Sequence, residues 1–312
     1  MPRIVHPRHR AAKTAVVTLI VIAGLASCTP FSNNSTAATV DGRSISRDKL
    51  ESIISEFVKS QQLPITDGVI AADDARSVLA GMIKADAYGS FLAELDQPVT
   101  KAQRAAVEKE LEAQNPGKLS NDLRNLIIGL NSATAAIKEL KAPSDDAIKR
   151  LYEKSPSLTG ALCARHIVVK KKTTADRILR RLAAGDDFVA LAKKYSIEPA
   201  AKTTGGALGG QTADGKPTPC MSILEYQQGF DPAFTAGAIA AKAGVPYGPV
   251  QSSFGWHVIL LEKWDTVADA ALEIVKAQPG PNLATGWLAN ADISVDPAYG
   301  RWSPATGSIT AG

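Results

Sequence analysis

The sequence predicts an α+β protein with two regions of different character. From Ser46 to about residue 157, apolar residues recur at the three- and four-residue spacing of amphipathic helices. Between residues 160 and 264, β-branched strand-like segments alternate with helical ones, which predicts a compact α+β unit. With 312 residues, of which 45% are hydrophobic and 21% charged, the chain is long enough for two folded domains.

The N-terminal segment has the pattern of an export signal. An uncharged run over residues 14–27 is shorter than the roughly 20 apolar residues of a membrane-spanning helix. It ends in Leu25-Ala26-Ser27-Cys28, which resembles the lipobox of bacterial lipoproteins. This resemblance implies a signal peptide over 1–27, a lipid on Cys28 and a polar tether over 28–37, so that the mature protein is lipid-anchored at the extracytoplasmic face of the cell membrane. A plain signal peptide or an anchor helix, with an incidental cysteine, is the alternative.

The charge distribution argues against a nucleic-acid partner. The formal net charge of +4 comes from 35 basic and 31 acidic residues. Four basic residues precede Cys28, and no acidic residue occurs before Asp41; the four are Arg3, Arg8, Arg10 and Lys13. Cleavage before Cys28 therefore leaves 31 basic and 31 acidic residues, so the mature chain is neutral.

The region over 38–157 is predicted to be mainly helical. A short strand over 38–45 contains an Asp41-Gly42 turn, and Ser46 has the position of a helix N-cap. Further helices are expected to begin near Asp73, Thr100 and Ser120 and after Pro143. Such amphipathic helices are more often a plain bundle than a binding surface.

The second region and the tail have a less regular pattern. The unit over 160–264 contains predicted strands over 162–169 and 256–262, and predicted helices over 175–182, 188–195 and 232–241. The segment over 265–312 shows a helix over 267–277, a Pro/Gly turn and a possible strand over 292–296. This tail is too short for a core of its own, so it must pack on another part of the chain.

Four motifs occur in order through the second region. They are Ala164-Arg165-His166-Ile167-Val168-Val169, Gly205-Gly206-Ala207-Leu208-Gly209, Gly248-Pro249-Val250 and Phe254-Gly255-Trp256-His257-Val258-Ile259. This order resembles the parvulin family of peptidyl-prolyl isomerases over about residues 161–264. The resemblance implies a small antiparallel sheet with surrounding helices, and catalysis of cis/trans isomerisation at X–Pro bonds.

The flanking segments extend the resemblance. Val40-Asp41-Gly42-Arg43-Ser44-Ile45-Ser46 and the lead-in from Pro143 look like those of PrsA- and SurA-like extracytoplasmic foldases. In that group the isomerase domain is inserted in, or appended to, a mainly helical chaperone domain similar to the SurA N-terminal domain. The segment over 265–312 would then complete this domain and join the first strand near Val40. The implied partners are unfolded or partly folded secreted and envelope proteins with exposed prolines.

The resemblance also assigns a candidate site. Isomerisation crosses a barrier of about 18–20 kcal/mol and needs an enclosed apolar slot for the proline ring with polar groups beside it, but no cofactor or metal. Leu208, Phe230 and Phe234 fall at the family's proline-pocket positions, with Ser252 nearby. The catalytic candidates are His166, Glu198 and His257. Each assignment has a plainer alternative, because the two phenylalanines could be ordinary core residues and the two histidines could chiefly maintain a hydrogen-bond network.

Two departures leave the level of activity open. Glu198 stands where the family usually has Cys or Asp, and Ala207 replaces the Asp of the glycine turn, which is followed by a lengthened loop over 211–219. The main reading is a membrane-anchored foldase with isomerase activity. The first alternative is a client-binding chaperone with a degenerate isomerase domain, and a more remote one is a surface lipoprotein that captures small ligands.

The sequence also contains two further cysteines and a run of three lysines. With Cys28 lipidated, Cys163 and Cys220 are an even pair in an oxidising compartment, which predicts a disulfide. Strand alternation places Cys163 on the opposite face from His166, which argues against a Cys–His nucleophile. The run Lys170-Lys171-Lys172 is more often a solvated loop than a site for an acidic or phosphorylated ligand.

Overall fold

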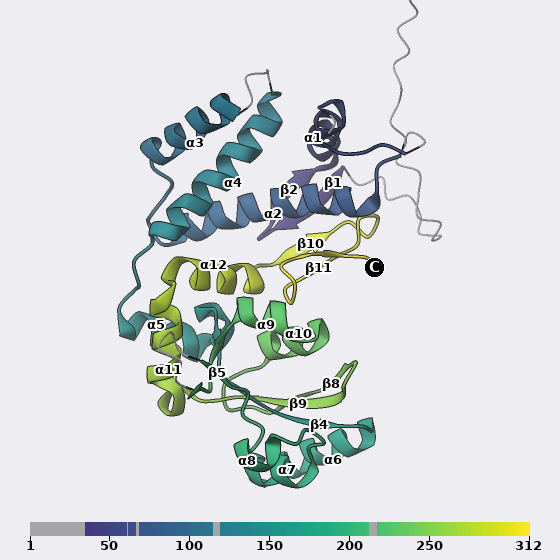
Figure 1. Ribbon diagram of the computed structural model, residues 1–312, viewed down its shortest axis with the longest axis vertical. Coiled ribbons are helices and arrows are strands. Elements are labelled where there is room, and N and C mark those ends of the chain that lie inside the picture. The colour runs from purple at the N-terminus through teal and green to yellow at the C-terminus, as the bar shows by residue number, and fades with distance from the viewer. Residues whose placement is uncertain (1–34, 61, 67–68, 115–118, 212–216) are drawn as a thin grey trace, which may run out of the picture.

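The protein has an α+β fold, which confirms the predicted fold class (Figure 1). The computed structural model describes residues 35–60, 62–66, 69–114, 119–211 and 217–312. The predicted signal peptide, Cys28 and most of the predicted tether lie outside these ranges. Within them, no helix has the length and apolar character needed to cross a bilayer. A helical region with a small sheet lies at one end of the long axis, and a sheet flanked by helices lies at the other.

The N-terminal strand is the middle strand of the first sheet. β1 (Thr36–Val40) lies between β2 (Arg43–Ser46) and β10 (Ile293–Val295), and it is antiparallel to both. Ala38 pairs with Val295, so the C-terminal segment returns to the first strand of the chain. The prediction of a tether reaching residue 37 was wrong by two residues, because β1 begins at Thr36 and Ala37 is fully buried.

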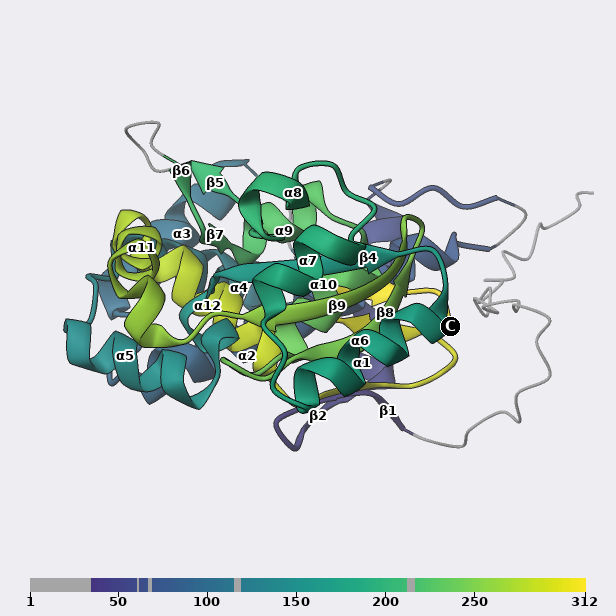
Figure 2. The same ribbon diagram turned by 90° about the horizontal axis from the view of Figure 1, so that it is seen from below.

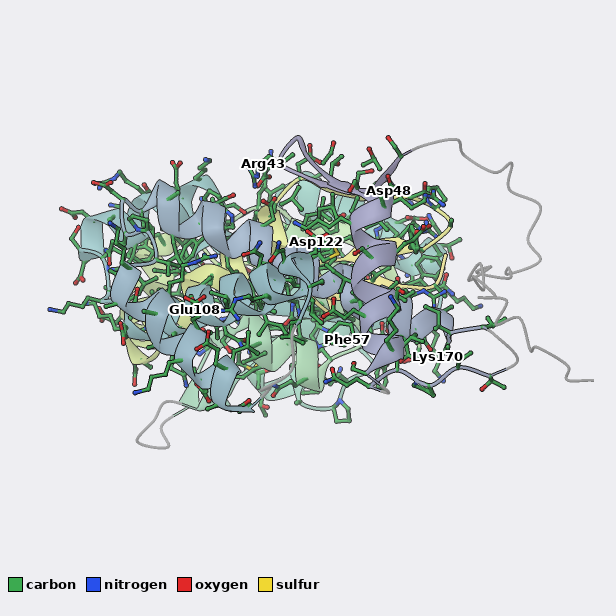
Figure 3. The ribbon with its side chains drawn as sticks, turned by 90° about the horizontal axis from the view of Figure 1, so that it is seen from above. Arg43, Asp48, Phe57, Glu108, Asp122 and Lys170 are labelled. Atoms are coloured by element: carbon green, nitrogen blue, oxygen red, sulfur yellow. A yellow bond between two sulfur atoms is a disulfide. The ribbon has the colours of Figure 1, made fainter. Side chains whose placement is uncertain are left out.

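Seven of the described helices lie outside the second region. They are α1 (Arg47–Lys59), α2 (Ala72–Glu94), α3 (Lys101–Gln114), α4 (Asn121–Glu139), α5 (Asp145–Lys154), α11 (Trp264–Ala277) and α12 (Pro279–Asn290). Of these, α1 and α2 pack directly on the first sheet. The side chains of Ser46, Ser120 and Ser144 accept a backbone N–H three residues on and so cap α1, α4 and α5. Figure 3 views this end from above, with Glu108 of α3 facing α4, where it pairs with Arg124.

Residues 279–290 form α12, where the sequence analysis expected a Pro/Gly turn. Pro279 and Pro281 lie in the first helical turn, where backbone N–H groups have no partner within the helix, so their missing N–H groups cost little. α12 packs against α2, α4 and the 3-10 helix η1 (Pro156–Thr159). The tail also contains a hairpin of β11 (Arg301–Ser303) and β12 (Ser308–Thr310), which no sequence pattern revealed.

The second region is built on a three-stranded antiparallel sheet. β9 (Gly255–Leu261) lies between β4 (Ala164–Val169) and β8 (Tyr247–Ser252). Five helices surround it: α6 (Lys172–Ala183), α7 (Phe188–Tyr195), α8 (Ala201–Thr204), α9 (Ile223–Gly229) and α10 (Pro232–Ala240). Two short strand pairs complete the region: β3 (Ala161–Leu162) with β7 (Met221–Ser222), and β5 (Gly210–Gln211) with β6 (Pro217–Thr218). In Figure 2, seen from below, α6 and α7 cover the outer face of the sheet.

A disulfide lies where the two regions meet. Cys163, between β3 and β4, is bonded to Cys220, directly before β7, with their Cα atoms 4.0 Å apart. Both cysteines are fully buried in one hydrophobic cluster with Tyr152 of α5 and Trp264 of α11. The Tyr152 hydroxyl donates a hydrogen bond to the backbone oxygen of Glu262 at 2.9 Å. The two regions therefore share a continuous core.

The close packing of α12 makes a testable prediction. A Cβ atom at Gly280 would lie 1.7 Å from the backbone oxygen of Ile137, and one at Gly286 would lie 2.5 Å from that of Ser157. We expect Gly280→Ala and Gly286→Ala each to lower the free energy of unfolding by about 1–3 kcal/mol or more, measured by urea denaturation. Gly129→Ala on α4 is the control, because nothing lies within 4 Å of its Cβ position. It should raise stability by about 0.5–1 kcal/mol, and equal effects at all three sites would contradict the packing of α12.

Candidate active site

The pairing of β4 with β9 places two histidines side by side. His166 pairs with Ile259 and His257 pairs with Val168, so the two imidazoles are diagonal neighbours on one face of the sheet. Their rings are stacked with centroids 5.4 Å apart, and the two Nδ1 atoms are 3.2 Å apart. Only 7% of His166 and 4% of His257 is exposed, so both rings depend on protein partners for their hydrogen bonds.

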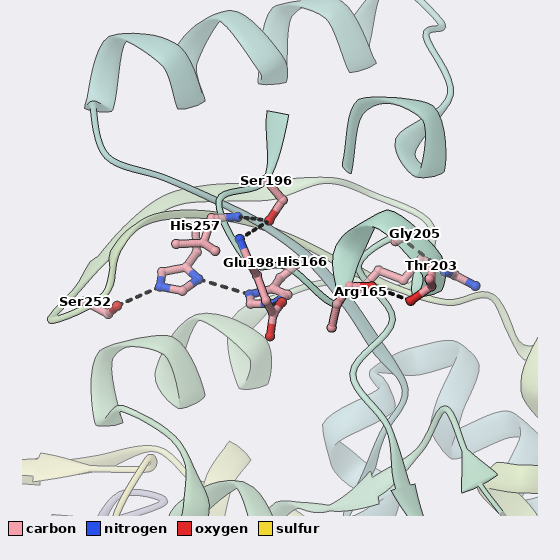
Figure 4. Close-up of polar contacts among 10 residues, drawn as sticks. Arg165, His166, Ser196, Glu198, Thr203, Gly205, Ser252 and His257 are labelled. Carbon is pink, nitrogen blue, oxygen red and sulfur yellow. Dashed lines mark hydrogen bonds and ion pairs between the residues drawn. The ribbon is translucent and has the colours of Figure 1, made fainter. Parts of the chain in front are cut away.

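Each histidine has a second partner at its other ring nitrogen (Figure 4). His166 Nε2 lies 2.6 Å from Oε2 of Glu198, and His257 Nε2 lies 2.6 Å from the Ser252 hydroxyl. The Phe254 backbone N–H donates to the same hydroxyl at 3.0 Å. Glu198, His166, His257 and Ser252 therefore form one row of hydrogen bonds, which we call the polar row.

The donors and acceptors of the polar row can all point in one direction. A carboxylate only accepts hydrogen bonds, so Glu198 requires a proton on His166 Nε2. A neutral His166 then accepts at Nδ1 from His257 Nδ1–H, and His257 accepts at Nε2 from the Ser252 O–H. Burial first, and the nearby His166 second, lower the pKa of His257 to about 4, so its ring is neutral at pH 7. In this arrangement every ring nitrogen of the two histidines has a hydrogen-bond partner.

Short backbone contacts fix the groups around the row. The Ile197 N–H donates to the Val168 carbonyl at 2.9 Å, which holds the segment that carries Glu198 against the edge of β4. On the same edge, the His166 N–H donates to the Gly206 carbonyl and the Leu208 N–H to the Ala164 carbonyl. Gly206 has φ +79°, and a Cβ atom there would lie 2.2 Å from the His166 oxygen, so only glycine allows this approach.

A pocket with a volume of about 380 Å³ opens beside the polar row. Leu208, Phe230 and Phe234 line its apolar side. The Phe234 ring is 2% exposed, and its centroid is 5.4 Å from the His166 ring and 5.0 Å from the His257 ring. This volume falls in the range of small-ligand sites. Among the described residues, no group of His, Cys, Asp or Glu is arranged to hold a metal ion.

The structure brings six of the seven proposed site residues to this pocket. Ser252 is the exception: it does not line the pocket, but its hydroxyl is hydrogen-bonded to His257 and to the Phe254 N–H, and both of these residues do line it. Sequence reasoning did not assign the other five lining residues to the site: Val168, Ile197, Gly229, Asp231 and Phe254. Val168 and Phe254 belong to the quoted motifs themselves, and Ile197 directly precedes Glu198. Asp231 caps α10, and its carboxylate accepts hydrogen bonds from the N–H and hydroxyl of Ser253 at 3.1 and 2.9 Å.

The chain is similar to known proteins of one kind. Residues 168–263 match the PPIC-type PPIase domain of the rotamase family. The foldase protein PrsA of Caldanaerobacter subterraneus is 28% identical over 238 residues, which are 72% of this chain and 72% of that protein. PrsA of Clostridium kluyveri is 38% identical over 113 residues, 36% of this chain but only 30% of that protein. The crystal structure of PrsA from Bacillus subtilis aligns over 84% of this chain and 94% of that one, with 20% identity and a TM-score of 0.28.

The lowered pKa of His257 predicts a loss of stability in acid. The unfolded chain binds a proton at this histidine near pH 6.5, whereas the folded protein binds it only near pH 4. The contribution of His257 to stability should therefore be complete above pH 6.5 and fall by about 3 kcal/mol as the pH drops to 4. Urea denaturation from pH 4 to 7 measures this, and His257→Gln should flatten the profile in that window.

The same prediction can be checked at the ring itself. The ring nitrogen shifts of His257, followed by NMR, should stay those of a neutral imidazole from pH 7 down to about pH 5. A midpoint near 6.5 would show that burial does not hold this ring neutral.

Proposed function

We propose that this protein isomerises X–Pro bonds in unfolded secreted and envelope proteins, because residues 168–263 match the PPIC-type PPIase domain and the chain is similar to PrsA foldases. We further propose that it acts at the extracytoplasmic face of the cell membrane, held there by a lipid on Cys28. The observation that carries the proposal is the apolar slot of Leu208, Phe230 and Phe234 against the polar row.

The slot supplies the binding energy. A proline ring placed between Leu208, Phe230 and Phe234 leaves water and contacts side chains that are already packed. Phe230 and Phe234 stack with centroids 5.7 Å apart, and Phe230 stacks on Tyr226 at 4.8 Å. These rings cannot rearrange freely, so the slot holds the proline ring while the remainder of the substrate rotates about the X–Pro bond.

The polar row faces the bond that rotates. Twisting the amide breaks its resonance, and the twisted state has a dipole that differs from that of the planar amide. In this proposal, His166, His257 and Glu198 present oriented hydrogen-bonding groups to that state. Fixed dipoles in a partly buried site favour the twisted amide without being reorganised during the reaction. Ser252 acts through His257, because its hydroxyl fixes the tautomer of that ring.

The helical region is proposed to hold the client. Its similarity to PrsA foldases supports this role, and the core shared through α5, α11 and α12 fixes it relative to the isomerase domain. A client-binding chaperone with a weak isomerase site is the second candidate. Ala207 is the observation that favours it, because this position in the glycine turn has no carboxylate.

Removal of the slot should abolish the rate gain. In a refolding assay limited by proline isomerisation, the chain from residue 35 onward should accelerate refolding over buffer. Phe234→Ala should lose at least about tenfold of that gain, equivalent to about 1.4 kcal/mol of transition-state binding, because it removes a wall of the slot that contacts the proline ring.

Phe91→Ala, which truncates a similarly buried ring on α2, is the matched control for general destabilisation and should keep the gain. Aggregation of a client is measured in the same samples. If the unmodified protein suppresses aggregation but does not accelerate refolding, the proposed isomerase activity is wrong and the function of a client-binding chaperone is favoured.

The proposed lipid anchor is tested by mass spectrometry of the N-terminal peptide and by separation of membrane and soluble fractions. The full-length protein expressed in a bacterium should partition with membranes, and its N-terminal peptide should begin at a Cys28 that carries diacylglycerol. Cys28→Ala should move the protein to the soluble fraction. An unprocessed chain that keeps Met1 would refute lipidation.

A further inference from the structure

The mouth of the pocket combines exposed apolar side chains with carboxylates. Phe254 is 72% exposed and Ile197 is 46% exposed, which is unusual for side chains of this size. Both line the pocket, together with Glu198 and Asp231. These four residues lie outside the slot assigned to the proline ring, so they are available to a neighbouring residue of the substrate.

The charge of this mouth is negative. Of the eleven residues that line the pocket, two are acidic and none is Lys or Arg. The Asp231 carboxylate is held by the Ser253 and Ala233 donors, which lower its pKa against the effect of burial, so it is ionised at neutral pH. Glu198 receives one hydrogen bond, from His166, and 38% of its side chain is exposed. A protonated group on a substrate can therefore approach Glu198 from solvent.

The run of lysines after β4 does not line the pocket. Lys170, Lys171 and Lys172 follow β4 beyond its last residue, and all three are exposed. Lys172 is already paired with Asp176 at 3.1 Å, and its Nζ lies 5.8 Å from the centre of the Trp256 ring. The mouth thus keeps its negative charge despite a basic segment nearby in the sequence.

We propose that this pocket prefers X–Pro segments with a lysine or arginine beside the proline, recognised by Glu198 for its charge and by Phe254 and Ile197 for its aliphatic stem. The proposal rests on the proposed function and specifies its substrate class. Lys and Arg carry a long apolar stem and a terminal cation, so they match a mouth with exposed apolar side chains next to a carboxylate. The face of Phe254 also attracts a cation. An acidic residue in the same place meets repulsion from both carboxylates.

The test compares peptides that differ in one residue beside the proline. Lysine, its uncharged counterpart norleucine, and glutamate are placed before the proline in one series and after it in a second. For the unmodified protein we expect kcat/KM for lysine to exceed that for glutamate by about fivefold in at least one series, with norleucine between them. The ratio should shrink in 0.5 M salt, because an exposed ion pair is screened.

Two variants locate the source of the preference. Glu198→Gln removes the charge of this side chain, so the ratio of kcat/KM for the lysine peptide to that for the glutamate peptide should fall close to 1. This holds whatever the substitution does to the rate itself. The matched control is the double variant Lys170→Ala with Lys171→Ala, which should leave the ratio within about twofold. A ratio that changes only in the lysine variant, or a preference for glutamate in both series, would overturn the proposal.

Affinity separates this inference from the proposed function. Dissociation constants of fluorescently labelled versions of the same peptides report the preference without catalysis. If no peptide is isomerised, the proposed function fails, and the ratio of dissociation constants still decides the inference. Equal affinities for lysine, norleucine and glutamate peptides in both series would refute it.

Discussion

The antiparallel register between β4 and β9 determines the geometry of the site, because it alone sets His166 against His257. His166 lies opposite Ile259 and His257 opposite Val168, which makes the two rings diagonal neighbours on the same face. A slip of one residue would turn one ring to the other face, where Ile167 and Val258 pack against α6 and α7. Burial on both faces therefore fixes the register, and the polar row follows from it.

Buried contacts also bring together segments that are far apart in the sequence. β10 returns to pair with β1, while α12 lies against α2, α4 and η1 through Gly280 and Gly286. The cluster around the Cys163–Cys220 disulfide continues this core into the second region. The sheet that carries the polar row is therefore joined by buried contacts both to helices that precede it in the sequence and to helices that follow it.

Sequence reasoning reached the fold class because periodicity and motif order are local signals. The caps at Ser46, Ser120 and Ser144, and the strands that carry His166 and His257, can be recognised from neighbouring residues. α12 could not be recognised in this way, because Pro279 and Pro281 suggest a turn unless the helix is known to begin at these residues. Ile197 and Asp231 were missed for a different reason, because both reach the pocket through tertiary contacts: Ile197 is bonded to Val168 on the edge of β4, and Asp231 lies at the start of α10. The chemical roles of the site residues stay predictions.

Glu198 links the chemistry of the site to its selectivity. The extra methylene, relative to an aspartate, extends the carboxylate by about 1.5 Å, and the backbone of its segment is fixed on β4 through Ile197. From that position its oxygen reaches His166 at 2.6 Å, so the longer side chain completes the polar row. The same carboxylate is partly exposed at the mouth, where it adds negative charge beside Phe254. In the proposed mechanism one group therefore both orients the histidines and selects the substrate, so these two effects separate only when substrates of different charge are compared in the same variant.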